Sequence, residues 1–448
     1  MKMIRQKRKT RLILLWFCSL GAMHALKAQT SDSTIVKLSI NEAIRQSKES
    51  NKLIEVFRNE TSATQAELQD AKLGVLPRIL TNASYQRYSD VTLFEDVLGE
   101  SHSIPKPPNA NAGALGVEAA FNLYSGGRQK AAVAGAKHKD ELATINLNEQ
   151  EANIGLQVAV QYLDMVKYYY HEKLIKDQER RAQTRLKNIN AFYKNGKVTK
   201  SDVLRADVAL SNIQLNLTAN RNDCQISSHK LLTFLNKDYR TKIILEDTAS
   251  LHLPAIGEVE QLLGDYSETF SILKVKKNIE LQENRTKLTK SYNLPSINLF
   301  GGYGFNYPNT LVFPPQPQTF AVGLVGIKAT YDISSLYQNK NKVKASYIRE
   351  NELKQQKEWI EDNVQQEAKA LITKYAEALN RMSVIKKSIE QAEANYNIQN
   401  AKYSNQLSLL TDLLEADNLY YEAKFNYIQA NIGALSLYYR LLFLTGKL

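Results

Sequence analysis

The chain has 448 residues, with 58 lysines and arginines against 46 aspartates and glutamates, and its formal net charge is +12. Seven of these bases and no acid lie in residues 1–28, so the charge of the rest is only about +5, which argues against a nucleic-acid partner. Cys224 is the one cysteine after residue 28, which excludes an internal disulfide, and the histidines lack metal-ligand spacing. We therefore expect no metal and no cofactor.

Residues 1–28 are typical of a secretory signal peptide. Six lysines and arginines precede a short apolar run at residues 12–20, and small residues precede Gln29. That run is too short to span a bilayer, and no later segment offers about 20 uncharged apolar residues. We expect cleavage after Ala28. A large residue, Phe17, precedes Cys18 and disfavours its lipidation.

The placement of proline predicts two long helical regions. All ten prolines lie outside residues 109–253 and 318–448, and a proline inside a helix costs about 3 kcal/mol. The two regions are also related in sequence. The pattern Y-x-N-x6-D-x-L-x-A-D begins at Tyr193 and again at Tyr403, an offset of 210 residues. The chain therefore reads as a tandem repeat.

In chain order, each repeat is expected to run helix, strand, strand, long helix, helix. Residues 29–235 form the first repeat, with strands at about 77–90 and 114–124 and a long helix at about 126–195. Residues 236–448 form the second, with strands at about 295–307 and 320–333 and a long helix at about 336–405. Ser39 with Glu42 predicts a capping box, and Ser125 predicts a cap after which Gly126 and Gly127 let the chain bend.

The predicted strands alternate between apolar residues and polar or glycine residues. Ile297, Leu299, Tyr303 and Phe305 lie on one face of the strand at about 295–307, and that face suits lipid. A half-buried sheet of a soluble domain has the same period. The strands alone therefore leave both interpretations open.

The long helices favour the membrane interpretation. Apolar residues from Val364 to Tyr403 recur with a period of 3.5 residues. The positions from Ile154 to Tyr193 repeat this seam, with Gln161, Glu172 and Glu179 interrupting it. Such helices would run roughly 100 Å, further than ordinary globular domains need. Four strands cannot close a barrel, and lipid does not tolerate open strand edges, so three copies sharing 12 strands become the expectation.

Several motifs carry a family resemblance: LSINEAIRQSKESN at 38–51, FNLYSGGRQKAAVAGAK at 121–137, the two Y-x-N elements, and Leu-Pro before the first strand of each repeat. With these the chain resembles the TolC-like outer membrane efflux protein family over the whole sequence after residue 28. The resemblance implies a homotrimer with a 12-stranded transmembrane β-barrel in the outer-membrane lipid and a long α-helical barrel in the periplasm. Segments 90–113 and 308–318 would be cell-surface loops.

The function that the resemblance implies is that of a passive exit duct, not an enzyme, in a tripartite efflux or type I secretion system. A periplasmic adaptor and an inner-membrane pump of the RND or ABC type would open it. An autonomous porin and a periplasmic coiled-coil scaffold remain alternatives. The cargo stays open, because the pump selects it.

The resemblance also points to three candidate sites. Asp412 and Glu415 match an acidic constriction at the channel entrance, although both carboxylates could instead complement the helix dipole. Asp202 and Arg205 occupy the equivalent positions of the first repeat and form a possible closing latch. The adaptor-docking turns are expected at Asn195, Gly196, Lys197 and Val198 and at Asn405, Gln406, Leu407 and Ser408, where Gln406 replaces the family's usual glycine.

Overall fold

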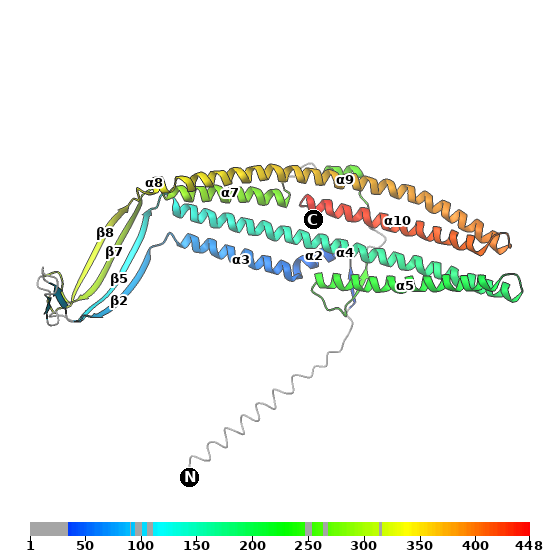
Figure 1. Ribbon diagram of the computed structural model, residues 1–448, viewed down its shortest axis with the longest axis horizontal. Coiled ribbons are helices and arrows are strands. Elements are labelled where there is room, and N and C mark those ends of the chain that lie inside the picture. Colours follow the sequence, from blue (N-terminus) through cyan, green and yellow to red (C-terminus); the bar gives the residue numbers. More distant parts are fainter. Residues whose placement is uncertain are drawn as a thin grey trace, which may run out of the picture.

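The computed structural model describes residues 35–89, 91–94, 101–104, 111–246, 253–262, 268–312 and 316–448. The expected signal peptide lies outside these residues. The molecule is elongated, with a four-stranded sheet at one end and two helical hairpins at the other (Figure 1).

The elements of the first repeat are, in order, β1 (Ile35–Leu38), α2 (Ile40–Ser50), α3 (Lys52–Leu73), β2 (Arg78–Arg87), β3 (Val91–Phe94), β4 (Ser101–Ile104), β5 (Asn111–Tyr124), α4 (Arg128–Lys194) and α5 (Lys200–Phe234). Those of the second are β6 (Lys242–Leu245), α6 (Ile256–Leu262), α7 (Phe270–Ser291), β7 (Ser296–Tyr307), β8 (Phe320–Thr330), α8 (Ser335–Gln338), α9 (Lys340–Ser404) and α10 (Leu410–Leu444).

The main sheet has the order β2-β5-β7-β8, with every neighbouring pair antiparallel. Its register places Ile79, Val117, Tyr303 and Val325 on one face, and these side chains are between 51% and 83% exposed. β2 and β8 are the edge strands, with no further strand beside them among the described residues. In the part of the chain that the structure describes, the sheet thus has an apolar face without cover and two open edges.

Two sheet features differ from the sequence-based expectation. The segment expected to be only a loop, residues 90–113, contains the antiparallel pair β3–β4 and the first residues of β5. β8 ends at Thr330, three residues earlier than expected, because the Asp332 carboxylate accepts the N–H of Ser334 (3.0 Å) and turns the chain. The short helix α8 follows, so the long helix begins at Lys340 instead of 336.

The expected helix caps are formed only in part. The Ser39 hydroxyl accepts the N–H of Glu42 (3.2 Å), but the Glu42 carboxylate binds Arg45 instead of closing the capping box. Ser125 does not cap α4 with its side chain, and the N–H of Arg128 donates to the Ser125 carbonyl (3.1 Å). The bend itself is made by Gly126 and Gly127, at φ +63° and +83°, where a Cβ would be strained.

The helices lie in two layers along the molecular axis. α4 and α9 run from the sheet to the tip, α3 and α5 follow each other along α4, and α7 and α10 follow each other along α9 (Figure 1). Asn51 joins α5 to α3, since its side chain accepts the N–H of Leu53 (2.9 Å) and donates to the Phe234 carbonyl (3.0 Å). A small parallel sheet, β1–β6, ties the starts of the two repeats together and was not predicted.

The heptad seam of the long helices is buried along part of its length. On α9, Val364, Ala368, Tyr375 and Met382 lie inside, with no more than 9% exposure. The polar residues that interrupt the α4 seam form hydrogen bonds with residues of α5. Glu172, for example, accepts from Arg221 Nε (3.0 Å). Within the described residues, no helix combines the length and the apolar character that crossing a membrane requires.

Candidate functional site: the helical tip and the sheet face

Both tip turns have the same backbone. The N–H of Gly196 bonds the Tyr193 carbonyl (2.9 Å), and the N–H of Gln406 bonds the Tyr403 carbonyl (3.0 Å). Gly196 lies at φ +69° and Gln406 at φ +60°, so the glutamine adopts the left-handed conformation that its glycine counterpart has. The replacement of glycine by Gln406 therefore changes the side chains of the turn and not its backbone. Leu407, for example, is 76% exposed.

The predicted acids occupy the first turns of the returning helices. The Asp202 carboxylate closes a capping box, because it accepts the N–H of Thr199 (3.0 Å) while Thr199 Oγ1 accepts the N–H of Asp202 (3.2 Å). Asp412 accepts the N–H of Leu409 at a longer 3.3 Å, and Glu415 is exposed one turn later. Both acidic residues of the second repeat therefore remain open to solvent or to a neighbouring molecule.

The structure does not place the proposed latch within one chain. Arg205 is exposed, and among the residues described it has no ion pair. The Asp202 carboxylate is already engaged by Thr199, which also donates its hydroxyl (2.7 Å). Any latch made by Arg205 therefore requires a carboxylate from another copy.

Tyr403, at the end of the α9 seam, was expected only as a packing residue. It is 9% exposed, whereas its counterpart Tyr193 is 42% exposed. The Tyr403 hydroxyl is buried without a hydrogen-bond partner in the described part of the chain, and burial, followed by the nearby Asp202 charge, raises its pKa. An unpaired buried hydroxyl beside Asp202 makes this tyrosine a further candidate tip residue.

A buried ion cluster lies behind the tip and was missed by the sequence analysis. The Asp417 carboxylate, 1% exposed, binds Arg181 Nη2 (2.8 Å) and Arg185 Nη2 (2.8 Å), both from α4. The Arg181 guanidinium lies 5.5 Å and 5.6 Å from the ring centres of Tyr396 and Tyr420. A signal existed, since Asp417 stands in the 3-4-3 spacing of Leu410, Leu413 and Tyr420 on α10, where an apolar residue is expected.

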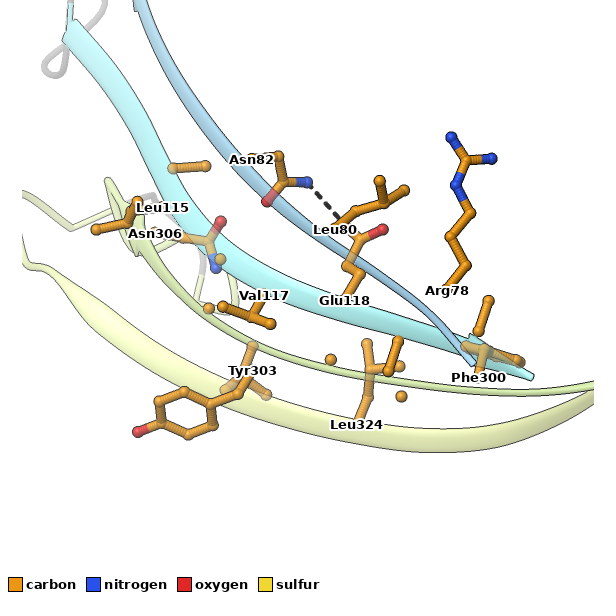
Figure 2. Close-up of a pocket in the computed structure, with 18 residues that line it drawn as sticks. Arg78, Leu80, Asn82, Leu115, Val117, Glu118, Phe300, Tyr303, Asn306 and Leu324 are labelled. Carbon is orange, nitrogen blue, oxygen red and sulfur yellow. Dashed lines mark hydrogen bonds between the residues drawn. The ribbon is translucent and has the colours of Figure 1, made fainter. Parts of the chain in front are cut away.

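The sheet carries a shallow hollow of about 410 Å³ on the face opposite Tyr303. Figure 2 shows Asn82 and Glu118 on this polar face, where Asn82 Nδ2 donates to Glu118 Oε1 (3.1 Å), while Tyr303 points to the other side. Glycine and alanine line much of the hollow, including Gly302 and Gly304. The sheet therefore has one apolar face and one face of mainly polar and small residues, among which Leu80, Phe300 and Leu324 also lie.

One group of side chains resembles a metal site. His138 and Glu141 of α4 meet Glu280 of α7, with their ligand atoms within 4.8 Å of one another. The ammonium group of Lys277 already lies among them, 2.8 Å from Glu141 and 2.5 Å from Glu280. These contacts make the group an ion-pair network across the α4–α7 interface. Sequence spacing could not reveal this network, since its residues come from two helices that are far apart in the sequence.

The comparisons identify the fold, and they place a family signature in the first repeat. A family model described as outer membrane efflux protein matches residues 43–237. The outer membrane protein VceC of Vibrio cholerae is similar in structure, with a TM-score of 0.74 and 16% identity over 91% of this chain and 96% of that chain. The CmeC outer membrane channel of Campylobacter jejuni gives a TM-score of 0.73 and 14% identity over 91% of this chain and 85% of that chain.

A membrane protein from Pseudomonas aeruginosa gives a TM-score of 0.76 at 13% identity, with coverage of 92% of this chain and 91% of that chain. No curated protein matches in sequence. Identities this low establish the shared fold, and the family model adds the sequence signature over the first repeat. The first repeat thus carries the sequence signature of the outer membrane efflux protein family, and the chain as a whole shares its fold with solved outer membrane channels.

Proposed function

We propose that this protein is the outer-membrane exit duct of a tripartite efflux or type I secretion system, acting as a passive conduit. Three copies share a 12-stranded barrel in the outer membrane, and their helices continue it as a tube through the periplasm. The observation that carries the proposal is the uncovered apolar face of a four-stranded sheet whose two edges are open. Lipid covers such a face, and strands of neighbouring copies pair such edges.

The helices support a shared wall in the same way. Leu204, Val208 and Leu215 form an apolar stripe on α5, each between 54% and 68% exposed. Val384 and Ile398 are exposed on α9, in the other helical layer. Large exposed apolar stripes mark protein contact surfaces. In the proposed trimer these stripes face neighbouring copies, which continues the pairing of the strand edges into the periplasm.

In the proposed trimer, the tip residues form the channel entrance and the adaptor contact. Asp412 and Glu415, repeated by threefold symmetry, form an acidic ring at the periplasmic entrance. Arg205 then reaches a carboxylate of the next copy as a closing latch. The exposed turns around Gly196 and Gln406 lie at the far end of the longest helices, where a periplasmic adaptor can reach them.

The first test is the oligomeric state and location of the full-length protein. We expect it in the outer-membrane fraction, and as a trimer by native mass spectrometry in mild detergent that dissociates on heating. A folded monomer with native strand content would contradict the shared barrel. A tag inserted within residues 308–318 should be labelled on intact cells, whereas labelling only after lysis would reverse the topology.

The second test separates a pump-coupled duct from an autonomous porin. We expect an adaptor to co-purify after cross-linking in cells, and loss of the protein to stop export of whatever cargo the attached pump carries. Gly196→Trp should remove the adaptor and export while the trimer persists, and Lys130→Met, far from the tip, serves as the control. Normal export with Gly196→Trp would move the docking site elsewhere.

A further inference from the structure

A cationic cavity lies where the sheet meets the helices. Its volume is about 800 Å³, and it lies between the end of α7, the starts of α4 and α9, and the ends of β7 and β8 nearest the helices. Ser296 and Thr330 contribute from the sheet, on the same face as Asn298 and Phe300. The cavity therefore lies on the polar side of the sheet and not on the apolar face.

Three cationic side chains line this cavity: Arg128, Lys342 and Arg349. None of them has an ion pair within the described residues. The one acid in the lining, Asp332, already accepts the N–H and the hydroxyl of Ser334. The cavity thus carries an excess of positive charge that the chain itself does not neutralise.

Arg128 has the most constrained environment of the three. It is half-buried, its Cζ atom lies 4.4 Å from the ring centre of Tyr292, and its Nε atom is buried without a hydrogen-bond partner in the residues described. A buried guanidinium N–H without an acceptor costs free energy, and stacking on an aromatic ring leaves the in-plane N–H groups free to donate. An acceptor supplied by a ligand would satisfy it.

The walls of the cavity are held in place without a ligand. Asn339, 6% exposed, donates to the Thr289 carbonyl (2.7 Å) and to Asn293 Oδ1 (2.8 Å), which fixes the start of α9 against the end of α7. Gly126 sets the direction of α4, because a Cβ there would lie 2.7 Å from the Ser291 carbonyl. Such preorganisation lowers the entropy cost of binding.

We infer that this cavity binds an anionic group, a phosphate or a carboxylate, with Arg128 as the principal ligand and Lys342 and Arg349 as supporting charges. The guanidinium offers the forked donors that match both groups. The binding itself rests on a single chain. Its placement inside the duct rests on the proposed function, which would repeat the cavity around the lumen where the barrel meets the tube. The anion is then a solute of the lumen, and a lipid headgroup is the alternative if the cavity opens to the membrane surface instead.

The test is calorimetric titration of the purified full-length protein, freed of lipid, with inorganic phosphate and with citrate at low ionic strength. We expect one site per chain and at least tenfold weaker binding for Arg128→Met and for Lys342→Met. Lys344→Met is the matched control, because Lys344 lies on the same helix outside the cavity, and its affinity should equal that of the wild type. Circular dichroism and native mass spectrometry confirm that each variant is folded.

A second arm identifies the source of the anion. Native mass spectrometry of protein extracted without delipidation should show bound phosphatidylglycerol, lost in Arg128→Met, if a lipid headgroup is the ligand. Its absence together with phosphate or citrate binding identifies a soluble anion. The inference is overturned if neither probe nor lipid binds, as when a neighbouring copy neutralises the cations, or if Lys344→Met weakens binding equally. Since export is not measured, failure here leaves the proposed duct untouched.

Discussion

Asp417 shows how one residue can join the two helical layers. Its carboxylate belongs to α10 and both of its arginine partners belong to α4. Burying three charges is costly, so such a cluster adds little net stability compared with apolar packing. Removing one partner is different, because it leaves uncompensated charge in the interior.

We therefore predict that Asp417→Ala lowers the free energy of unfolding by about 3 kcal/mol, the range found when a buried pair is broken. Arg185 would be left as a buried cation without an anion, and Arg181 would keep only its contact with Asp177. The control is Asp207→Ala, the equivalent position of the first repeat, which is exposed and should change stability by less than about 0.5 kcal/mol. Thermal unfolding in detergent measures the stability of both variants. A loss of stability in Asp417→Ala no larger than that in Asp207→Ala would show that the cluster is not structurally important.

His171 predicts a pH dependence of stability. It lies between three helices, with Nδ1 2.7 Å from Asn220 Oδ1, Nε2 2.6 Å from the Tyr421 hydroxyl, and its ring stacked on Phe425. Burial is the largest influence on its pKa and lowers it below the ordinary 6.5, although the hydrogen bond to Asn220 acts in the opposite direction.

The unfolded chain consequently takes up a proton at this residue before the folded chain does. The contribution to stability is complete above pH 6.5 and is lost as the pH falls through that value towards the lower folded pKa. We expect the unfolding temperature to fall more steeply between about pH 7 and pH 5 in the wild type than in His171→Phe, which has no proton to bind. Parallel pH profiles of the two proteins would exclude His171 as the source.

At the scale of elements, the two tip turns form a natural comparison. Each turn needs one residue with positive φ; the first repeat uses Gly196 and the second uses Gln406. Nothing within 4 Å would meet a Cβ at Gly196, so the cost of a side chain there comes from the backbone conformation alone. A left-handed conformation costs a residue with a Cβ about 1 kcal/mol or more.

Exchanging the two residue types should thus have opposite effects. Gly196→Ala is expected to lower the free energy of unfolding by about 1 kcal/mol. Gln406→Gly should raise it by about 0.5 kcal/mol, because relief of the strain is offset in part by the greater freedom of glycine in the unfolded chain. Unfolding in denaturant checks both signs. A destabilised Gln406→Gly variant would mean that the glutamine side chain makes a contact that outweighs the strain.

At the scale of the whole molecule, the proposed acidic ring would belong to the trimer and not to one chain. If Asp412 and Glu415 line the entrance, replacing both with alanine should weaken cation preference and abolish block by multivalent cations in single-channel recordings. Asp207→Ala is the control, since Asp207 is an exposed acid of α5 outside the candidate tip sites. Unchanged selectivity in a folded trimer would assign the two acids to the helix dipole instead.

Much of the architecture could be predicted from sequence because its signals are local. Proline-free stretches and the 3.5-residue seam indicated both long helices, and the period of two indicated the sheet faces. The offset between Tyr193 and Tyr403 indicated the repeat. The same local signals failed where strands were too short to show a period, as in β1, β3, β4 and β6.

The sequence by itself thus determined the lengths of the helices, their buried faces and the apolar side of the sheet, since each follows from the spacing of neighbouring residues. Only the tertiary structure decided which distant residues meet. It brought Asp417 to Arg181 and placed Arg128 beside Lys342 in one cavity, although more than 200 residues separate each pair. Spacing within a helix fixes which side a residue faces, whereas its partner across the interface depends on how the helices pack.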